Sequence, residues 1–185
     1  MHQILFYKGC YCSFYFDMLY FTTEKQLGGF IMLYFYPEDF GALGNGVNND
    51  CVAIQSAIDK AEENGGGTVV LTSGKTYYSD SIRMKKNVEL HLQKGSRLKA
   101  TDNIDGYIRP CNMINDPKTA LIGNPVTGKP SFVFIYGYEA DGCTISGEGI
   151  IDANGHAFVE RKDRYYVTGN FYPRPTVIYV EKSNN

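Results

Sequence analysis

The sequence has 185 residues, enough for one domain with a hydrophobic core. Its 18 basic and 20 acidic residues nearly balance, which gives no electrostatic case for nucleic-acid binding. Twenty glycines and 15 tyrosines, with no tryptophan, are typical of a turn-rich β protein. The five cysteines form no CxxC pair, so the sequence predicts neither a disulfide framework nor a metal site, and we expect no cofactor.

The N-terminal 31 residues differ in composition from the rest. Twelve of the 26 aromatic residues lie in the first 36 positions, without a regular period. The segment lacks the features of a signal peptide, and no apolar run reaches the ~20 residues that span a membrane. We expect residues 1–31 to be a disordered or wrongly assigned extension, with Met32 as the natural start, and residues 32–185 to be structured. A cytoplasmic location is the default, and an extracellular one stays open.

The first predicted elements are a strand and a helix. A strand is expected at Leu33–Tyr36, followed by a glycine- and asparagine-rich turn over residues 44–50. Helical spacing of apolar residues predicts a helix over Cys51–Glu63, which Asn49 or Asp50 can cap and a run of glycines ends. The apolar face of this helix consists of Cys51, Ile54, Ala57, Ile58 and Ala61.

After the helix the apolar period changes to two, which predicts a series of short strands. They are Thr68–Leu71, Ser81–Met84, Val88–Leu92, Arg97–Ala100, Ser131–Tyr136, Cys143–Ser146, Gly149–Asp152 and Thr176–Val180. Alternation within Val88–Leu92 leaves Glu89 and His91 outward. One helix among so many strands disfavours an α/β fold. Residues 103–130 and 153–175 are predicted to be long loops, where binding surfaces usually lie.

The order and spacing of several motifs resemble the opening of glycoside hydrolase family 28, the polygalacturonase type. The motifs are Asp39-Phe40-Gly41-Ala42, Gly44-Asn45-Gly46, Asn49-Asp50, Ala53-Ile54-Gln55, Gly65-Gly66-Gly67-Thr68-Val69, Lys86-Asn87-Val88-Glu89-Leu90, Gly95-Ser96-Arg97-Leu98, Thr144–Asp152 and Arg174-Pro175. The resemblance implies an all-β, right-handed, single-stranded parallel β-helix, capped at its N-terminal end by the predicted helix. We expect Leu90, Leu92, Leu98, Ile145 and Ile151 to point inward.

The resemblance also implies an inverting hydrolase of pectic or related acidic polysaccharides, which uses paired carboxylates. The family carries its catalytic residues in Asn-Thr-Asp, Asp-Asp, Gly-His-Gly and Arg-Ile-Lys motifs, and none occurs here. We therefore assign no catalytic residue, expect the carboxylates beyond Asn185 in a longer protein, and expect this chain alone to be inactive. His156 is interpreted as a loop residue. Asp152 is interpreted as a structural residue whose side chain bonds the turn backbone.

Four residues are candidates for contacting an acidic sugar, because arginine pairs with carboxylates and tyrosine stacks on sugar faces. They are Arg161, Arg164, Tyr165 and Tyr166, and the alternative is a solvated loop. The expected partner is a uronic-acid-containing poly- or oligosaccharide, with no nucleic acid and no membrane. An open coil end allows self-association. Two other functions stay open, a non-catalytic glycan-binding β-helix of tailspike type and a pectate-lyase-like eliminase, which would need a calcium-binding acidic cluster.

Overall fold

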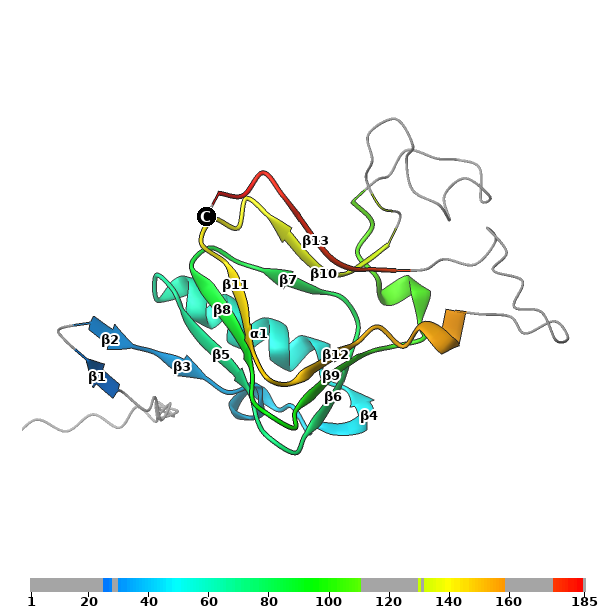
Figure 1. Ribbon diagram of the computed structural model, residues 1–185, viewed down its shortest axis with the longest axis horizontal. Coiled ribbons are helices and arrows are strands. Elements are labelled where there is room, and N and C mark those ends of the chain that lie inside the picture. The colour runs from blue at the N-terminus through cyan, green and yellow to red at the C-terminus, as the bar shows by residue number, and fades with distance from the viewer. Residues whose placement is uncertain (1–24, 28–29, 111–129, 131, 159–174, 185) are drawn as a thin grey trace, which may run out of the picture.

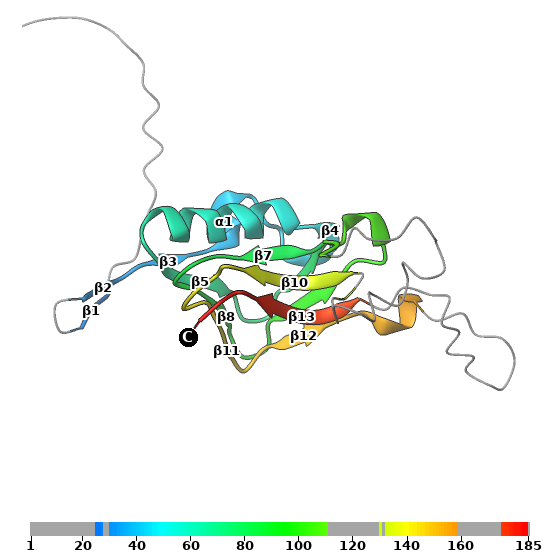
Figure 2. The ribbon, with the colours of Figure 1, turned by 90° about the horizontal axis from the view of Figure 1, so that it is seen from above.

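The computed structural model describes residues 25–27, 30–110, 130, 132–158 and 175–184. From residue 34 onward, short strands follow one another around stacked coils, and each strand pairs in parallel with a strand of a neighbouring coil (Figure 1). The helix α1 (Cys51–Glu63) covers one end of the stack (Figure 2). The predicted parallel β-helix is confirmed. No helix in the described part of the chain has the length and hydrophobicity to cross a membrane.

Three parallel sheets make up the walls of the coil. The first contains β3 (Tyr34–Phe35), β5 (Gly67–Leu71), β8 (Val88–Leu92) and β11 (Thr144–Gly147). The second contains β4 (Asn45–Asn49), β6 (Thr76–Ser79), β9 (Arg97–Ala100) and β12 (Ile150–Asp152). The third contains β7 (Ile82–Met84), β10 (Val133–Tyr138) and β13 (Thr176–Glu181). Short 3-10 helices lie at Pro37–Phe40, Ile104–Gly106 and Gly155–Phe158.

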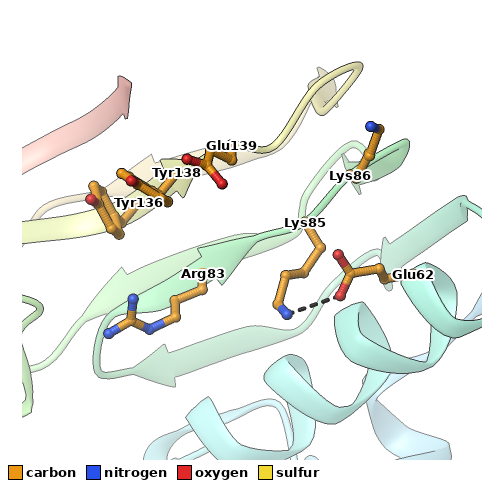
Figure 3. A pocket seen from close by; sticks show the side chains of 7 residues that line it. All are labelled: Glu62, Arg83, Lys85, Lys86, Tyr136, Tyr138 and Glu139. Atoms are coloured by element: carbon orange, nitrogen blue, oxygen red, sulfur yellow. Dashed lines mark hydrogen bonds and ion pairs between the residues drawn. The ribbon is translucent and has the colours of Figure 1, made fainter. Parts of the chain in front are cut away.

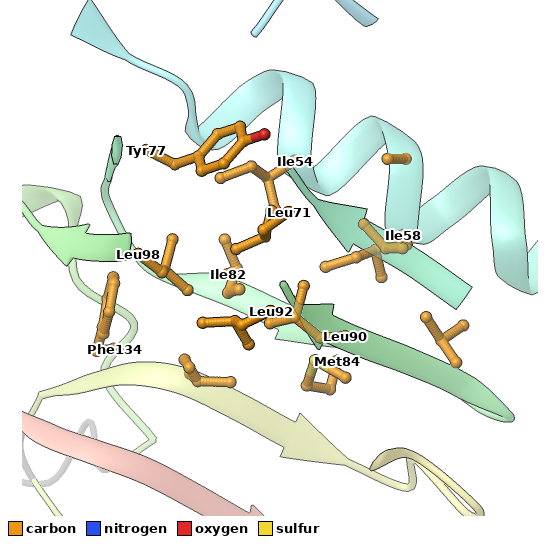
Figure 4. Packing of buried hydrophobic residues seen from close by; sticks show 14 of the residues in the cluster. Ile54, Ile58, Leu71, Tyr77, Ile82, Met84, Leu90, Leu92, Leu98 and Phe134 are labelled. Atoms are coloured by element: carbon orange, nitrogen blue, oxygen red, sulfur yellow. The ribbon is translucent and has the colours of Figure 1, made fainter. Parts of the chain in front are cut away.

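The core lies between the three sheets and under α1 (Figure 4). Leu90, Leu92 and Leu98 are buried, as predicted, because alternation turns them inward. Ile145 and Ile151 are partly buried and pack against the same cluster. They are less covered because their strands, β11 and β12, form the edges of their sheets.

The capping helix α1 agrees with the sequence in its bounds and its buried face. Its buried residues are Ala53, Ile54, Ala57, Ile58 and Ala61, while Cys51 is half-buried. Asn49 Oδ1 accepts a hydrogen bond from the backbone N of Cys51 at 3.0 Å. The expected cap by Asp50 is wrong, because its carboxylate accepts hydrogen bonds from the backbone N atoms of Leu43 and Gly44 and so stabilises the preceding turn.

Four strands were missed in the sequence, namely β1 (Lys25–Leu27), β2 (Phe30–Met32), β4 and β6. The strand β4 replaces a predicted turn, because its polar, exposed residues show no alternation and it pairs with β6 through the backbone, with a register shift. The strand β6 was overlooked because its inward side chains are a tyrosine and a serine. In the N-terminal segment, β1 and β2 pair antiparallel, so the expectation of no ordered motif is wrong for these residues. The domain boundary at residue 32 stays a prediction.

Candidate functional site

The outward surface of β7, β10 and β13 carries aligned aromatic side chains. We call it the tyrosine face, after Tyr136, Tyr138 and Tyr179. Tyr136 lies in register with Arg83 on one side and with Tyr179 on the other. The two tyrosine rings stack at 6.3 Å between centroids with an interplanar angle of 5°. The guanidinium of Arg83 lies 5.8 Å from the centroid of Tyr136, within the range of a cation–π contact.

The next row of the tyrosine face exposes an aromatic ring. Tyr138 is 43% exposed, whereas Tyr136 is 7% exposed. Lys182 Nζ donates to the hydroxyl of Tyr138 at 2.6 Å and also lies 4.8 Å from the centre of its ring. Tyr136 donates its hydroxyl to Glu181 Oε1 at 2.7 Å. Burial and then the carboxylate of Glu181 raise the pKa of Tyr136, so this hydroxyl stays protonated and donates at any physiological pH.

An open pocket of about 210 Å³ lies between this face and the capping helix (Figure 3). Its lining residues are Glu62, Arg83, Lys85, Lys86, Tyr136, Tyr138 and Glu139. Lys85 Nζ is 2.9 Å from Glu62 Oε2, and Lys86 Nζ is 3.5 Å from Asp141 Oδ2. Among the described residues no ion pair involves Arg83. Arg83 is therefore the pocket cation best placed to bind an anionic group of a ligand.

The two long connections in the chain end at this sheet. Residues 101–132 precede β10, and residues 153–175 precede β13. The four sequence-predicted contact residues, Arg161, Arg164, Tyr165 and Tyr166, belong to the second connection and lie outside the described residues. Their role stays a prediction.

The outward surface of β5, β8 and β11, which we call the Glu89 face, is polar but internally satisfied. Thr68 donates its hydroxyl to Glu89 Oε2 at 2.9 Å, and Ser146 donates its hydroxyl to Glu89 Oε1. His91 Nδ1 lies 2.7 Å from Ser146 Oγ. Since the single hydroxyl hydrogen of Ser146 points to Glu89, Nδ1 is the donor in this contact. Glu89 and His91 do point outward, as predicted.

The environment of Glu89 favours its ionised form. Partial burial by itself would raise its pKa, but the hydrogen bonds from Ser146 and Thr68 and the adjacent imidazole of His91 outweigh that effect. The pKa of Glu89 is therefore lowered. A carboxylate held in this way is a poor general acid or base at neutral pH, so the Glu89 face is a weaker candidate for chemistry.

Two residues weighed in the sequence have structural surroundings. Asp152 Oδ1 accepts from the backbone N of Asn154 at 2.9 Å, and Oδ2 pairs with Arg97 at 3.1 Å. This agrees with the predicted role in the turn. His156 is exposed in a 3-10 helix rather than in an irregular loop. In the described part of the chain, no group of three His, Cys, Asp or Glu residues is placed to hold a metal ion.

Sequence reasoning did not select Arg83, Tyr136, Tyr138 or Tyr179. Arg83, Tyr136 and Tyr179 lie within predicted strands, whereas Tyr138 lies beyond the predicted strand Ser131–Tyr136, since β10 extends to Tyr138. Outward positions follow from alternation once a strand is known. What the pattern lacked was the register that places a residue of β7 beside residues of β10 and β13. Reading aromatic residues at outward positions of consecutive predicted coils would have found the tyrosine pair.

Three known proteins are similar to this chain in sequence or in fold. A capsule KN3-specific depolymerase of Klebsiella phage KN3-1 is 32% identical over 103 residues, covering 56% of this chain and 13% of the depolymerase. A mannuronan C5-epimerase of Azotobacter vinelandii is 63% identical over 38 residues, covering 20% of this chain and 4% of the epimerase. The family 28 exopolygalacturonase of Yersinia enterocolitica superposes with a TM-score of 0.53 at 24% identity, covering 74% of this chain and 23% of that structure.

The structural match to the exopolygalacturonase confirms the right-handed parallel β-helix. This chain spans only a small part of each of the three relatives. The family model described as rhamnogalacturonase A/epimerase, pectate lyase-like, matches residues 38–154, more than half of the chain. The matched range contains α1, β10 and most of the pocket residues. The chain therefore belongs to the rhamnogalacturonase A/epimerase family of pectate lyase-like proteins.

Proposed function

We propose that the tyrosine face binds an anionic polysaccharide and that the chain contributes this face to a polysaccharide-acting protein of the glycoside hydrolase type. The observation that carries the proposal is Arg83, a cation without a carboxylate partner in the described residues, which lines the same pocket as the exposed ring of Tyr138. A guanidinium binds a carboxylate or sulfate through two parallel hydrogen bonds. An exposed ring offers an apolar face to the C–H side of a sugar.

The names of the relatives support a polymeric sugar as the ligand. They denote a capsule depolymerase, a mannuronan epimerase and an exopolygalacturonase. Because this chain spans a small share of each, we infer from them the class of ligand alone. A uronic-acid-containing glycan fits the charge of Arg83 best.

We propose that residues 1–185 bind without hydrolysing. Inverting hydrolysis needs an acid and a base roughly 6.5–9.5 Å apart with room for water between them. The described carboxylates of this face are already engaged: Glu62 with Lys85, Glu181 with Tyr136, and Glu139 with Lys182 at 3.9 Å. A carboxylate paired with a cation or a phenol does not supply a free base.

A tailspike-type glycan-binding protein is the second candidate. The depolymerase covers more than half of this chain, the longest stretch among the two curated relatives compared. The two candidates share the same ligand contacts and differ in whether a bond is cleaved. A reducing-sugar assay on polygalacturonate tests the proposal for residues 1–185: release of reducing ends by this chain would contradict the proposed absence of hydrolysis.

The binding proposal is tested by calorimetry with oligogalacturonate on the wild type and on Arg83→Met. We expect Arg83→Met to weaken binding about tenfold, since a charge-assisted hydrogen bond contributes about 1.5–3 kcal/mol. The matched control is Lys99→Met, which removes a cation lying 5.7 Å from the ring of Tyr78 on the second sheet. Equal affinities of the two variants, or no binding by the wild type, would contradict the proposal.

We also propose that the chain associates with a second copy of itself through the open coil end. In the described part of the chain, β11, β12 and β13 each form a sheet edge, and such an edge offers backbone groups for pairing with another strand. Ile178 continues the buried row of Ile82 and Ile135, yet it is 43% exposed. Sedimentation should show association that Ile178→Lys reduces. Val52→Lys, which changes an 80% exposed residue of α1 at the opposite end, is the control. Identical sedimentation of both variants would contradict this.

A further inference from the structure

The capping helix forms one wall of the pocket in addition to closing the coil. Gln55, Asp59 and Glu62 occupy positions i, i+4 and i+7 of α1 and therefore lie on one side of it. That side runs along β7, the edge strand that contributes Arg83.

Gln55 acts like one residue of an extra strand beside β7. The backbone N of Arg83 donates to Gln55 Oε1 at 2.8 Å, and Gln55 Nε2 donates to the carbonyl oxygen of Arg83 at 3.1 Å. Gln55 Nε2 also donates to Asp59 Oδ1 at 2.9 Å. The amide thus satisfies the otherwise unpaired edge of β7 and fixes the backbone of Arg83 relative to α1.

One turn further along, the helix reaches into the pocket. Glu62 Oε2 lies 2.9 Å from Lys85 Nζ (Figure 3). Asp59 Oδ1 lies 3.8 Å from the same atom. Both members of the Glu62–Lys85 pair keep solvent contact, with side chains 40% and 35% exposed. A ligand can therefore reach Lys85, but it must compete with Glu62.

Resting on the proposed glycan function, we propose that Glu62 is a specificity-determining residue that limits the pocket to one anionic group, at Arg83. An acidic group next to Arg83 meets an unneutralised cation. A second acidic group next to Lys85 must displace Glu62 and is repelled by it. The ligand class that fits is a glycan whose charged sugars are spaced by neutral ones, rather than a contiguous polyanion.

The test compares two probes that differ in charge density, oligogalacturonate and its partly methyl-esterified form. Glu62→Gln keeps the shape of the side chain but removes the charge that opposes the second acidic group. We expect Glu62→Gln to raise the affinity for oligogalacturonate about threefold, the size of a surface ion-pair effect, and to leave the affinity for the esterified probe nearly unchanged. The gain should vanish in about 1 M salt, where the Debye length is ~3 Å.

Two further variants isolate the mechanism. Glu63→Gln is the matched control, because Glu63 is the next residue of α1 and pairs with Lys60 at 3.1 Å outside the pocket. The double variant Glu62→Gln/Lys85→Met should lose the gain, since it removes the cation that Glu62→Gln frees. Thermal melting checks that all variants fold. A residue that only supports the fold would change both probes alike.

The outcomes separate the inference from the function on which it rests. A selective gain in Glu62→Gln that disappears in the double variant supports the inference. Wild-type binding with no difference between Glu62→Gln and Glu63→Gln overturns the inference and leaves the glycan function standing. An absence of binding by the wild type and by every variant overturns both.

Discussion

The tyrosine face and the Glu89 face are built on the same coils and differ in how their polar groups are used. On the Glu89 face, a carboxylate accepts two hydroxyl hydrogen bonds and an imidazole completes the chain of contacts. On the tyrosine face, rings stack across strands and Arg83 has no carboxylate partner in the described residues. The polar groups of the Glu89 face are hydrogen-bonded within the protein, whereas the guanidinium of Arg83 on the tyrosine face can still bind an anionic ligand.

This difference shows that alternation decides which residues point outward but not what an outward residue does. Glu89 on β8 and Arg83 on β7 are both outward residues, and their strands follow one another in the chain but belong to different sheets. The partners across the strands make one structural and the other available. On such a scaffold, the role of an outward residue therefore depends on the residues beside it on the neighbouring strands.

The largest expected effect concerns the shared interior beneath both faces. Leu90 lies under the Glu89 face and Ile135 under the tyrosine face, and both are fully buried. Replacement of either by alanine should lower the free energy of unfolding by about 2–5 kcal/mol, measured by urea denaturation. Ile178→Ala, at a 43% exposed position, should cost clearly less and serves as the control. A large loss on one side only would show that the faces do not share one cooperative core.

A smaller effect is expected when the hydrogen bonds of Glu89 with Thr68 and Ser146 are broken. Glu89→Gln replaces one carboxylate oxygen by an amide NH2, which cannot accept, so either Thr68 or Ser146 loses its acceptor. We expect a loss of about 1 kcal/mol of unfolding free energy near neutral pH. The affinity for oligogalacturonate should not change, because this face is satisfied without ligand.

The loss of unfolding free energy in Glu89→Gln should depend on pH. The pKa of Glu89 is lower in the folded than in the unfolded chain, so the unfolded chain binds the proton first as the pH falls. The stabilisation is complete above the unfolded pKa of about 4.3 and is lost as the pH falls through the folded pKa. Urea denaturation at about pH 6 and pH 3 should show the difference between wild type and variant shrinking in acid. If wild type and Glu89→Gln differed in unfolding free energy at about pH 3 as much as at about pH 6, the stabilising role of the Glu89 carboxylate would be contradicted.

The smallest effect is expected for an ion pair that lies outside the tyrosine face and the Glu89 face. Lys94 Nζ lies 3.9 Å from Glu148 Oε2, and the two side chains are 85% and 76% exposed. Lys94→Met should change the unfolding free energy by less than about 0.5 kcal/mol, because solvent and salt screen such pairs. A loss of unfolding free energy as large as that in Glu89→Gln would mean that the hydrogen bonds of Glu89 stabilise the fold no more than an exposed ion pair does.

The sequence predicted the coils well because short apolar alternation and glycine turns are local signals. Val88–Leu92 and Arg97–Ala100 match β8 and β9, and Cys51–Glu63 matches α1. The strands β4 and β6 lacked an apolar alternation and were missed. The tyrosine face was missed, because it depends on the register between strands far apart in the chain, which was not assigned from the sequence. The candidates Arg161 and Arg164 lie outside the described residues.

The central claim, that the tyrosine face and not the Glu89 face binds an anionic glycan, is tested most directly by mapping the contact surface. Backbone and arginine side-chain NMR shifts would be followed during titration with oligogalacturonate. We predict changes at Arg83, Tyr136 and Tyr138, none at Glu89 or His91, and a loss of the changes in Arg83→Met. Changes centred on Glu89 and His91, or an unaltered titration of Arg83→Met, would contradict the account.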